Sequence, residues 1–386
     1  MLRALDPAPP ASTTLVDFSS NDYISFGQSP KLRKKLADAI EAPATSLYGP
    51  PSSRLLDGNS PLHASLEHRL AAFFQGPSAL LFNSGFDANA GLWACLPGPD
   101  DWIVYDELVH ASIHDGMRAS RVPKERRRAF KHNSLRVLET TLQSIIEQDE
   151  GVRLGERSVW VGVETLYSMD GDLAPLREMA ELVERVLPAG NGHLVVDEAH
   201  STGLYGPSGR GLTCALGLAN RVTVRVHTFG KAMACSGAVV LASPLIRDYL
   251  INYARPLIYS TAMTYMSALA IQKSLEMLEE GESEPSRMST APPSTSPIIP
   301  LLTSSPRPLA GFLRERGFLV RPITYPTVPR GEERVRICLH AGNTQEEVEG
   351  LCEAVKEWIK REERAVSGSS GQSRAPFPAE PVLAKL

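Results

Sequence analysis

The sequence lacks the features that mark several large classes of protein. No apolar run approaches the roughly 18 residues of a membrane-spanning helix, so a membrane protein is not expected. The formal net charge of −4 argues against a broadly basic nucleic-acid binder. The first residues, MLRALDPAPP, contain no long apolar segment, so a secretory signal peptide is not expected and the cytoplasm is the default location.

Cysteines and two catalytic motifs are also scarce or missing. The 386-residue chain has five cysteines, which are far apart and form no C-x-x-C pair. A disulfide framework is therefore not expected, and no metal site is predicted. The sequence has neither the phosphate loop G-x-x-x-x-G-K-[ST] of nucleotide hydrolases nor the G-x-S-x-G turn of many serine hydrolases.

What the sequence does contain is an alternation of strand-like and helix-like segments. Short runs rich in Val, Ile and Leu are typical of strands buried on both faces. These runs are Ala79–Phe82, Ile103–Tyr105, Val159–Val163, His193–Val196, Val222–Val226 and Ala238–Leu241. Helical spacing separates several of them, as in Pro61–Phe74, where Ser60 is a predicted N-cap. The predicted fold class is α/β, with a mostly parallel sheet between layers of helices.

Composition divides the chain into a large domain and a smaller one. The range 281–308 has seven prolines and seven serines, which indicates an irregular connection. The predicted parts are an N-terminal segment 1–50, a large domain 51–280, the connection 281–308, a small α+β domain 309–364 and a disordered tail 365–386.

The C-terminal part has its own predicted elements. Ile298–Leu302 is a candidate short strand within the connection, and Phe318–Ile323 and Arg334–Leu339 are predicted strands. A helix is predicted from about Gln345, where Thr344 and Glu347 form a capping box.

Two charged residues follow predicted strands, where a parallel sheet binds its ligands. Lys231 comes just after the strand in VTVRVHTFGKAMA, beside small residues, and this suits a Schiff base with an aldehyde cofactor. Asp197 ends the strand in HLVVDEAHSTG, where a carboxylate can pair with a protonated pyridine nitrogen, and His200 can bond the hydroxyl of that ring. A Mg²⁺-binding Asp–Glu pair is the alternative, and the missing phosphate loop disfavours it.

Three more segments place polar groups after predicted strands. In SALLFNSGFDANAGL, the residues 84–86 lie between a strand and a helix, where free N–H groups can hold a phosphate. His110 in DELVHAS can stack on a flat ring, and Ser168 lies in TLYSMDGD beyond another strand. A Ser–His–Asp hydrolase is the alternative interpretation, and the missing G-x-S-x-G turn disfavours it.

Together these segments resemble a known family. NSGF, VHAS, YSMDGD, VDEAHSTG, HTFGKA and IYSTAM, in this order and spacing, are similar to the motifs of the α-oxoamine synthases. The resemblance extends from about Val16 to Lys360, and it implies a pyridoxal-phosphate (PLP) enzyme of aminotransferase fold type I. Within that family, RPLIYST and the segment Pro326–Pro329 most resemble the branch that acts in biotin synthesis.

The resemblance implies roles around the cofactor ring. Lys231 is expected to form the Schiff base with PLP and later to move protons. Asp197 is expected to pair with the ring nitrogen, His200 and Ser168 to contact the ring oxygen, and His110 to stack on the ring.

It also implies residues for the phosphate and the substrates. The phosphate is expected to contact Ser84, Gly85, Phe86 and Thr228 of the same subunit. It is also expected to contact Thr261 of the partner subunit, which implies a homodimer with its active site at the interface. The substrate contacts that the resemblance implies are Asn21 and Arg336 for the amino-acid carboxylate and Thr327 for the acyl substrate.

The reaction implied is a decarboxylating condensation of an amino acid, L-alanine in the biotin branch, with an acyl-CoA such as pimeloyl-CoA. Aminoketobutyrate ligases, aminolevulinate synthases, sphingoid-type synthases and secondary-metabolite synthases stay open as alternatives. A non-catalytic paralogue that keeps the fold is the alternative from another class, and the joint presence of Lys231, Asp197 and His200 argues against it.

Two short segments suggest further partners. The basic run KERRRAFK, Lys124–Lys131, is a candidate phosphate contact or nuclear signal, but a solvated helix or loop face is favoured. The tripeptide Ala384–Lys385–Leu386 resembles the S-K-L signal, which predicts a peroxisomal import receptor as partner and the peroxisome as location.

Overall fold

The computed structural model describes residues 15–42, 49–281 and 296–368. The tripeptide Ala384–Lys385–Leu386, on which the predicted peroxisomal location rests, lies outside the described residues, as do most of the predicted tail and the middle of the predicted connection. The chain forms two compact units. The small unit comprises Met1–Tyr23, Ser168–Gly171 and Ser296–Leu386, and the large unit comprises Ile24–Tyr167 and Asp172–Thr295. These boundaries differ from the composition-based ones because two segments distant in sequence join the small unit.

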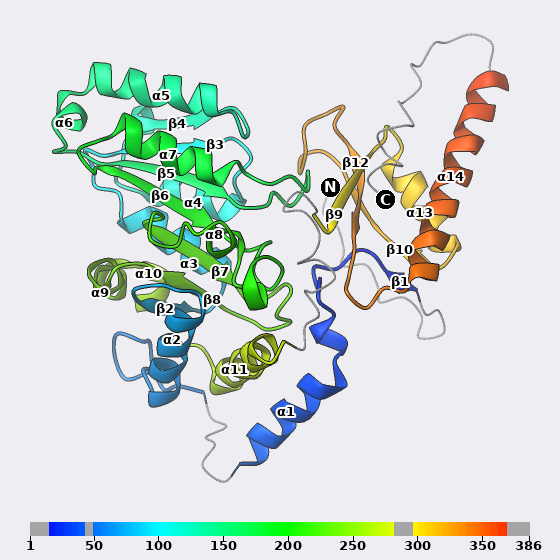
Figure 1. Ribbon diagram of the computed structural model, residues 1–386, viewed down its shortest axis with the longest axis horizontal. Coiled ribbons are helices and arrows are strands. Elements are labelled where there is room, and N and C mark those ends of the chain that lie inside the picture. Colours follow the sequence, from blue (N-terminus) through cyan, green and yellow to red (C-terminus); the bar gives the residue numbers. More distant parts are fainter. Residues whose placement is uncertain (1–14, 43–48, 282–295, 369–386) are drawn as a thin grey trace. The chain divides into compact units, whose positions relative to one another are not determined.

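The large unit is built on a seven-stranded sheet (Figure 1). Its strands are β2 (Ala79–Phe82), β3 (Trp102–Asp106), β4 (Arg127–Phe130), β5 (Val159–Glu164), β6 (Gly192–Asp197), β7 (Val224–Thr228) and β8 (Ala238–Leu241). Their spatial order is β2-β8-β7-β6-β5-β3-β4. Only β8 is antiparallel to its neighbours, β2 and β7, so every other strand points the same way and the predicted mostly parallel sheet is confirmed.

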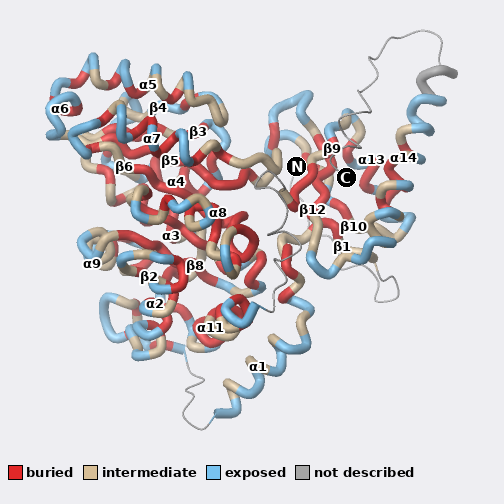
Figure 2. Tube along the Cα trace, in the orientation of Figure 1, coloured by how far each residue is buried: buried red, intermediate tan, exposed pale blue. Residues whose placement is uncertain are grey.

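Helices cover both faces of this sheet. One hydrophobic core joins β3, β5 and β6 to α5 (Leu135–Gln148) and α7 (Leu176–Val186). The core on the other face joins the sheet to α3 (Gly85–Cys95), α4 (Ala111–Ala119), α9 (Pro244–Tyr253) and α10 (Arg255–Ile258). Figure 2 shows the buried strands and the exposed outer faces of these helices.

The remaining helical segments of the large unit lie between and around these layers. They are η1 (Phe26–Gln28), α1 (Pro30–Glu41), α2 (Pro61–Phe73), η2 (Lys124–Arg126), α6 (Glu150–Arg153), η3 (Pro207–Gly209), α8 (Leu212–Ala215) and α11 (Tyr265–Glu279). As predicted, Ser60 caps α2: its side chain accepts a hydrogen bond from the backbone N–H of His63 at 3.3 Å, and Pro61 takes the first helical position. No described helix has both the length and the apolar character of a membrane span.

The small unit has its own sheets and core. An antiparallel sheet has the order β11 (Arg321–Ile323), β12 (Arg334–Cys338), β9 (Ile298–Leu302), and β1 (Val16–Asp17) pairs in parallel with β10 (Phe318–Leu319). Its apolar core includes residues of α13 (Pro306–Glu315) and α14 (Gln345–Gly368). The predicted capping box is confirmed, since Thr344 Oγ1 accepts from the Glu347 N–H at 3.2 Å and Glu347 Oε2 accepts from the Thr344 N–H at 2.9 Å.

Three predicted elements differ from the structure. The predicted strand Phe318–Ile323 is split into β10 and β11, which pair with different strands. The candidate strand Ile298–Leu302 within the predicted connection is confirmed as β9, but the last residues of that connection, 306–308, belong to α13. The basic run is a helical face only at Lys124–Arg126, which forms η2; the prediction is wrong for Arg127–Phe130, which forms the edge strand β4 beside β3. Its arginines are partly engaged, since Arg127 donates to the backbone oxygens of Val122 and Ser120.

Candidate active site

Four of the predicted segments follow strands of the large unit that point in the same direction. β2 leads to Ser84, β3 leads to His110, β6 ends at Asp197, and β7 leads to Lys231. The carboxyl ends of such strands meet at one edge of the sheet, where ligands bind in open α/β folds. The structure therefore brings the predicted cofactor residues of the large unit to one edge.

Asp197 is a buried carboxylate held by neutral groups. It is 5% exposed, and its Oδ2 accepts a hydrogen bond from Asn89 Nδ2 at 2.7 Å. Its Oδ1 accepts one from the backbone N–H of Ala199 at 2.8 Å. These donors orient the carboxylate without cancelling its charge, so the site is suited to a positively charged partner such as a protonated ring nitrogen.

Lys231 lies on the turn after β7, the strand that pairs with β6. The turn is closed by hydrogen bonds from the Ala234 N–H to the Lys231 oxygen at 2.9 Å and from the Cys235 N–H to the Phe229 oxygen at 2.8 Å. Lys231 itself is half-buried. Desolvation raises the pKa of the Cys235 thiol to about 12, which indicates an unreactive thiol.

The loop after Asp197 packs closely on the lysine turn. His200 is 5% exposed in this loop. Gly203 has a φ of +82°, and a Cβ there would lie 2.9 Å from the Cβ of Ala232, so this contact requires glycine. The close packing holds the two catalytic loops at a fixed separation.

The start of α3 forms a cradle that fits a phosphate group. Ser84 is the N-cap, and its Oγ accepts a hydrogen bond from the Asp87 N–H at 3.0 Å. A Cβ on Gly85 would lie 2.3 Å from Thr228 Cγ2, so only glycine fits at this contact. Thr228 Oγ1 is buried and has no hydrogen-bond partner among the described residues. The N–H groups of the first helical turn and this hydroxyl are the donors that bind anions at helix starts.

His110 and Phe86 present rings at the same edge. Both are exposed, and their ring centroids lie 6.5 Å apart in an edge-on arrangement. The backbone N–H of His110 donates to Glu164 Oε1 at 2.6 Å, and burial raises the pKa of Glu164 well above its ordinary value. An exposed imidazole in this position has a face free for stacking on a flat cofactor ring.

Thr261 is exposed and lies beside the phosphate cradle of its own chain. Its backbone oxygen accepts a hydrogen bond at 2.8 Å from Nδ2 of Asn83, the residue before Ser84. The contact of Thr261 with the cofactor of a partner subunit stays a prediction.

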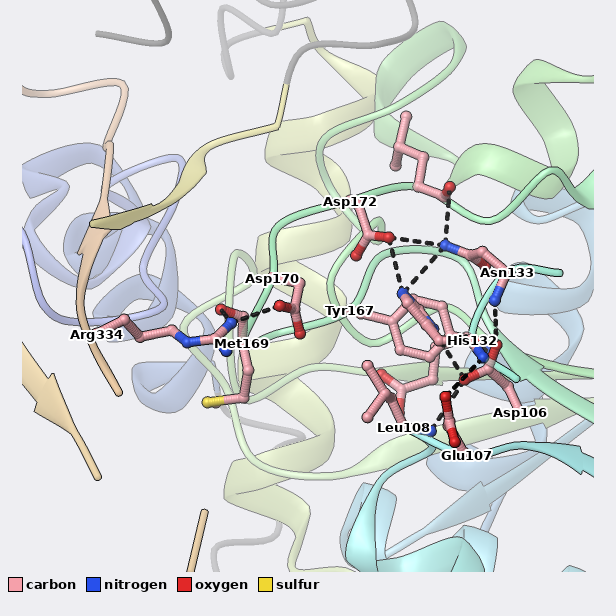
Figure 3. Close-up of polar contacts among 12 residues, drawn as sticks. Asp106, Glu107, Leu108, His132, Asn133, Tyr167, Met169, Asp170, Asp172 and Arg334 are labelled. Atoms are coloured by element: carbon pink, nitrogen blue, oxygen red, sulfur yellow. Dashed lines mark hydrogen bonds and ion pairs between the residues drawn. The ribbon is translucent and has the colours of Figure 1, made fainter. Parts of the chain in front are cut away.

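The small unit brings together three other predicted residues. Arg336 on β12 is 8% exposed and donates to Asn21 Oδ1 at 3.2 Å and to the Ser168 backbone oxygen at 3.4 Å. These acceptors are neutral, and its Nε has no partner among the described residues. The neighbouring Arg334, in contrast, is ion-paired with Asp170 (Figure 3). Thr327 is exposed in the turn after β11.

Glu198 has a structural role, which disfavours the alternative of an Asp–Glu metal pair. It is fully buried and accepts hydrogen bonds from the N–H groups of Leu212 at 2.8 Å and Thr213 at 2.9 Å, and from the Ser201 hydroxyl. Its carboxylate is thus occupied by the first turn of α8 and by Ser201. In the described parts of the chain, no group of three or more His, Cys, Asp and Glu residues is arranged to hold a metal ion.

A second buried aspartate, at the end of β3, has a different environment (Figure 3). Asp106 Oδ1 accepts from the Leu108 N–H at 2.9 Å and from His132 Nδ1 at 2.9 Å, and its Oδ2 accepts from the Asn133 N–H at 2.8 Å. His132 Nε2 donates to Asp172 Oδ2 at 2.8 Å. Burial alone would lower the pKa of His132, but its hydrogen bonds with Asp106 and Asp172 raise it to about 10, so this histidine is charged at neutral pH.

Sequence reasoning missed three residues of the site. Asn89 and Ser112 connect Asp197 to His110, and Glu164 holds the backbone of His110. Asn89 is a polar residue among the buried residues of α3. A buried polar side chain needs a hydrogen-bond partner, and this was the signal that could have indicated its role.

Comparisons with known proteins agree with this geometry. The family model for aminotransferase class I and II matches residues 13–291 and 290–355. The chain is 47% identical over 374 residues to 8-amino-7-oxononanoate synthase from Emericella nidulans, covering 90% of each protein. It is 35% identical over 395 residues to the aminoacyl transferase sphA from Aspergillus fumigatus, covering 92% of this chain and 83% of that protein.

Solved structures give the same picture. The 8-amino-7-oxononanoate synthase of Francisella tularensis superposes with a TM-score of 0.71 at 26% identity, covering 90% of this chain and 99% of that one. A serine palmitoyltransferase from S. paucimobilis superposes with a TM-score of 0.78 at 24% identity over 91% and 89% of the two chains, which is a likeness of fold. The predicted family, fold and cofactor are thereby confirmed. The chain belongs to the aminotransferase class I and II family and, within it, to the PLP-dependent acyltransferases known as α-oxoamine synthases.

Proposed function

We propose that this chain condenses L-alanine with pimeloyl-CoA, releasing CoA and CO₂, to form 8-amino-7-oxononanoate in biotin synthesis. The observation that carries the chemistry is the placement of Lys231 and Asp197 after the paired strands β7 and β6, with the phosphate cradle at the same sheet edge. The choice of substrates is supported by the relative from Emericella nidulans, which bears the name of this activity at 47% identity.

The residues of the large unit fit PLP. When bound, PLP supplies an electron-accepting ring that stabilises negative charge on the α-carbon of an amino acid. Lys231 would bind the aldehyde carbon and then move the α-proton. Asp197 would keep a proton on the ring nitrogen, and His200 would donate to the ring oxygen. Thr228 and the first turn of α3 would hold the phosphate, for which the buried unpartnered hydroxyl of Thr228 is suited.

The small unit supplies a candidate group for the amino-acid carboxylate. The guanidinium of Arg336 is buried and contacts neutral oxygens, so its charge is available to an anion. A guanidinium binds a carboxylate through two parallel hydrogen bonds, and Asn21 orients it for that contact. Thr327 would face the acyl substrate and Ser168 the ring oxygen, as the family resemblance implies.

The test is a CoA-release assay of the purified, PLP-loaded protein. L-alanine, glycine and L-serine are each paired with pimeloyl-CoA, acetyl-CoA and palmitoyl-CoA. We expect rapid CoA release only from L-alanine with pimeloyl-CoA, with the amino ketone identified by mass spectrometry. Lys231→Ala is the negative control and should release none. Absence of CoA release from every pair would support a non-catalytic paralogue instead.

A second candidate is a sphingoid-type or secondary-metabolite synthase. The observation that favours it is the 35% identity to the aminoacyl transferase sphA over 92% of this chain. Preferential CoA release from L-serine or glycine with a long-chain acyl-CoA would establish this candidate and overturn the first.

We also infer that the working form is a homodimer. Leu56 and Tyr259 are 67% and 72% exposed, and Tyr259 lies two residues before Thr261, the residue expected to reach the partner's cofactor. Tyrosine is among the residues that are enriched at subunit interfaces. Sedimentation of the loaded protein should give twice the 42.0 kDa mass of the chain, and a monomer with full activity would contradict the inference.

A further inference from the structure

The protonation of His110 is determined by two hydrogen bonds from Ser112. His110 is the N-cap of α4, and its Nδ1 lies 3.2 Å from the backbone nitrogen and 2.7 Å from the hydroxyl oxygen of Ser112. A backbone N–H can only donate, so Nδ1 must accept and carries no proton. The neutral ring therefore carries its single proton on Nε2.

The same contacts continue to Asp197 with a fixed direction. The Ser112 hydroxyl is fully buried, donates to His110 Nδ1 and accepts from Asn89 Nδ2 at 3.1 Å. The second hydrogen of Asn89 Nδ2 is donated to Asp197 Oδ2 at 2.7 Å. Asn89 thus donates twice, the Ser112 hydroxyl accepts once and donates once, and His110 accepts. We name these two linking residues, Asn89 and Ser112, the relay.

The charges around His110 favour the same neutral form. The positive end of the α4 dipole opposes a cation at the N-cap. Partial desolvation lowers the pKa of His110; Asp197 acts in the opposite direction, and the ammonium of Lys231 lowers it further. The other titratable groups that face it are Glu164, whose pKa is raised by burial, and His114, whose pKa is lowered by burial.

We propose that Asn89 and Ser112 are positioning residues that hold His110 as the neutral Nε2–H tautomer and aim Asp197 at the cofactor ring nitrogen. The inference rests on the proposed function, in which His110 stacks on PLP. A neutral imidazole adds no repulsion toward a protonated cofactor ring. The neutral Asn89 donor also leaves the charge of Asp197 available to that ring, whereas a cationic donor would cancel it.

The test reads the imidazole directly. The PLP-loaded protein is labelled with ¹⁵N in its histidine rings, and His110→Gln identifies the His110 signals. In the wild type we expect the neutral Nε2–H tautomer throughout the range of about pH 6 to 8. An ordinary histidine, with a pKa of about 6.5, would gain a proton within this range. In Ser112→Ala the tautomer preference should weaken and the protonation midpoint should rise by up to about one pH unit, the shift that one lost hydrogen bond can produce.

Ser78→Ala is the matched control, because Ser78 donates to the Ala242 oxygen at 2.6 Å just before β2, away from the relay. This control should leave the His110 signals unchanged. A charged imidazole or an Nδ1–H tautomer in the wild type at pH 7 would overturn the proposal. An unchanged spectrum in Ser112→Ala would overturn it as well.

A second readout follows Asp197 and needs no substrate. The pH midpoint of the visible absorption band of bound PLP should shift in Asn89→Ser and stay unchanged in Ser78→Ala. If Asn89→Ser does not fold, Ser112→Ala decides the proposal through its histidine spectrum. Shifted spectra without CoA release would overturn the proposed function and keep the relay. Unshifted spectra with normal CoA release would overturn the relay alone.

Discussion

Two buried aspartates end parallel strands of the same sheet, and their surroundings differ in charge. Asp106 ends β3 and accepts hydrogen bonds from two backbone N–H groups and from the charged ring of His132. Asp197 ends β6 and accepts hydrogen bonds from one backbone N–H and the neutral amide of Asn89. Both are almost completely withdrawn from water.

The difference separates a structural carboxylate from a functional one. A buried charge is tolerated when a partner compensates it, and Asp106 has that partner within its own fold. Asp197 accepts hydrogen bonds from two donors that orient it and carry no positive charge, so a cationic ligand would complete its environment. The sequence position is the same in both cases, and only the neighbours reveal the role.

The largest expected effect is on turnover after Asp197→Asn. The asparagine keeps the shape and, through its single amide oxygen, one of the two accepted hydrogen bonds, but it removes the charge that holds a proton on the cofactor. We expect kcat to fall by about 10²–10⁴-fold, the range that a proton-holding group contributes to catalysis. CoA release measures kcat, and urea unfolding should give a stability close to wild type. A large loss of stability with near-normal kcat would reverse the roles assigned to the two aspartates.

Asp106→Asn should have the opposite outcome, with a large effect on stability. The change leaves His132 with only Asp172 as a charged partner in a mostly buried position. Breaking a buried ion pair from one side costs about 3–5 kcal/mol, and the free energy of unfolding in urea should fall toward that range. The double variant with His132→Gln should lose less than the sum of the single changes, because the two residues form one pair. Additive losses would contradict the pairing.

The pH dependence of stability should sharpen the same contrast. The pKa of His132 rises from its ordinary value of 6.5 to about 10 in the folded protein. Its stabilisation is therefore fully present below about pH 6.5 and is lost as the pH rises toward 10, by at most about 1.4 kcal/mol per pH unit. The difference in unfolding free energy between wild type and His132→Gln should shrink from pH 6.5 to 10. A difference that stays constant over this range would contradict a charged His132.

Much of the fold could be predicted because its strands carry local signals. The apolar runs around Leu80, Val161 and Val240 are buried on both faces, and such runs mark central strands without any knowledge of tertiary contacts. Lys231 and Asp197 could be predicted for the same reason, since each follows a recognisable strand. The direction of the strands then places them at one edge.

The contacts that distinguish the two aspartates could not be predicted from local pattern. Asn89 is 108 residues from Asp197 and 23 from Ser112, and neither separation leaves a periodic signal. The same holds for Asp172, which is 40 residues from His132. The sequence also did not predict that Ser168–Gly171 belongs to the small unit, because a segment this short has no composition or periodicity that distinguishes it from its neighbours.

The smallest expected effect concerns two buried threonine hydroxyls that have no hydrogen-bond partner among the described residues. Thr228 contacts Gly85 at the start of α3 through its Cγ2 methyl group, whereas Thr213 lies in α8. Thr228→Val should weaken PLP binding by about 5- to 10-fold, because one hydrogen bond to an anion is lost, at roughly 1 kcal/mol. Thr213→Val makes the same chemical change and should leave the Kd for PLP unchanged. Absorbance titration of the cofactor-free variants measures both constants. If PLP affinity fell equally in the two variants, the Thr228 hydroxyl would have no specific contact with the phosphate. The phosphate cradle would then consist of the α3 backbone N–H groups alone.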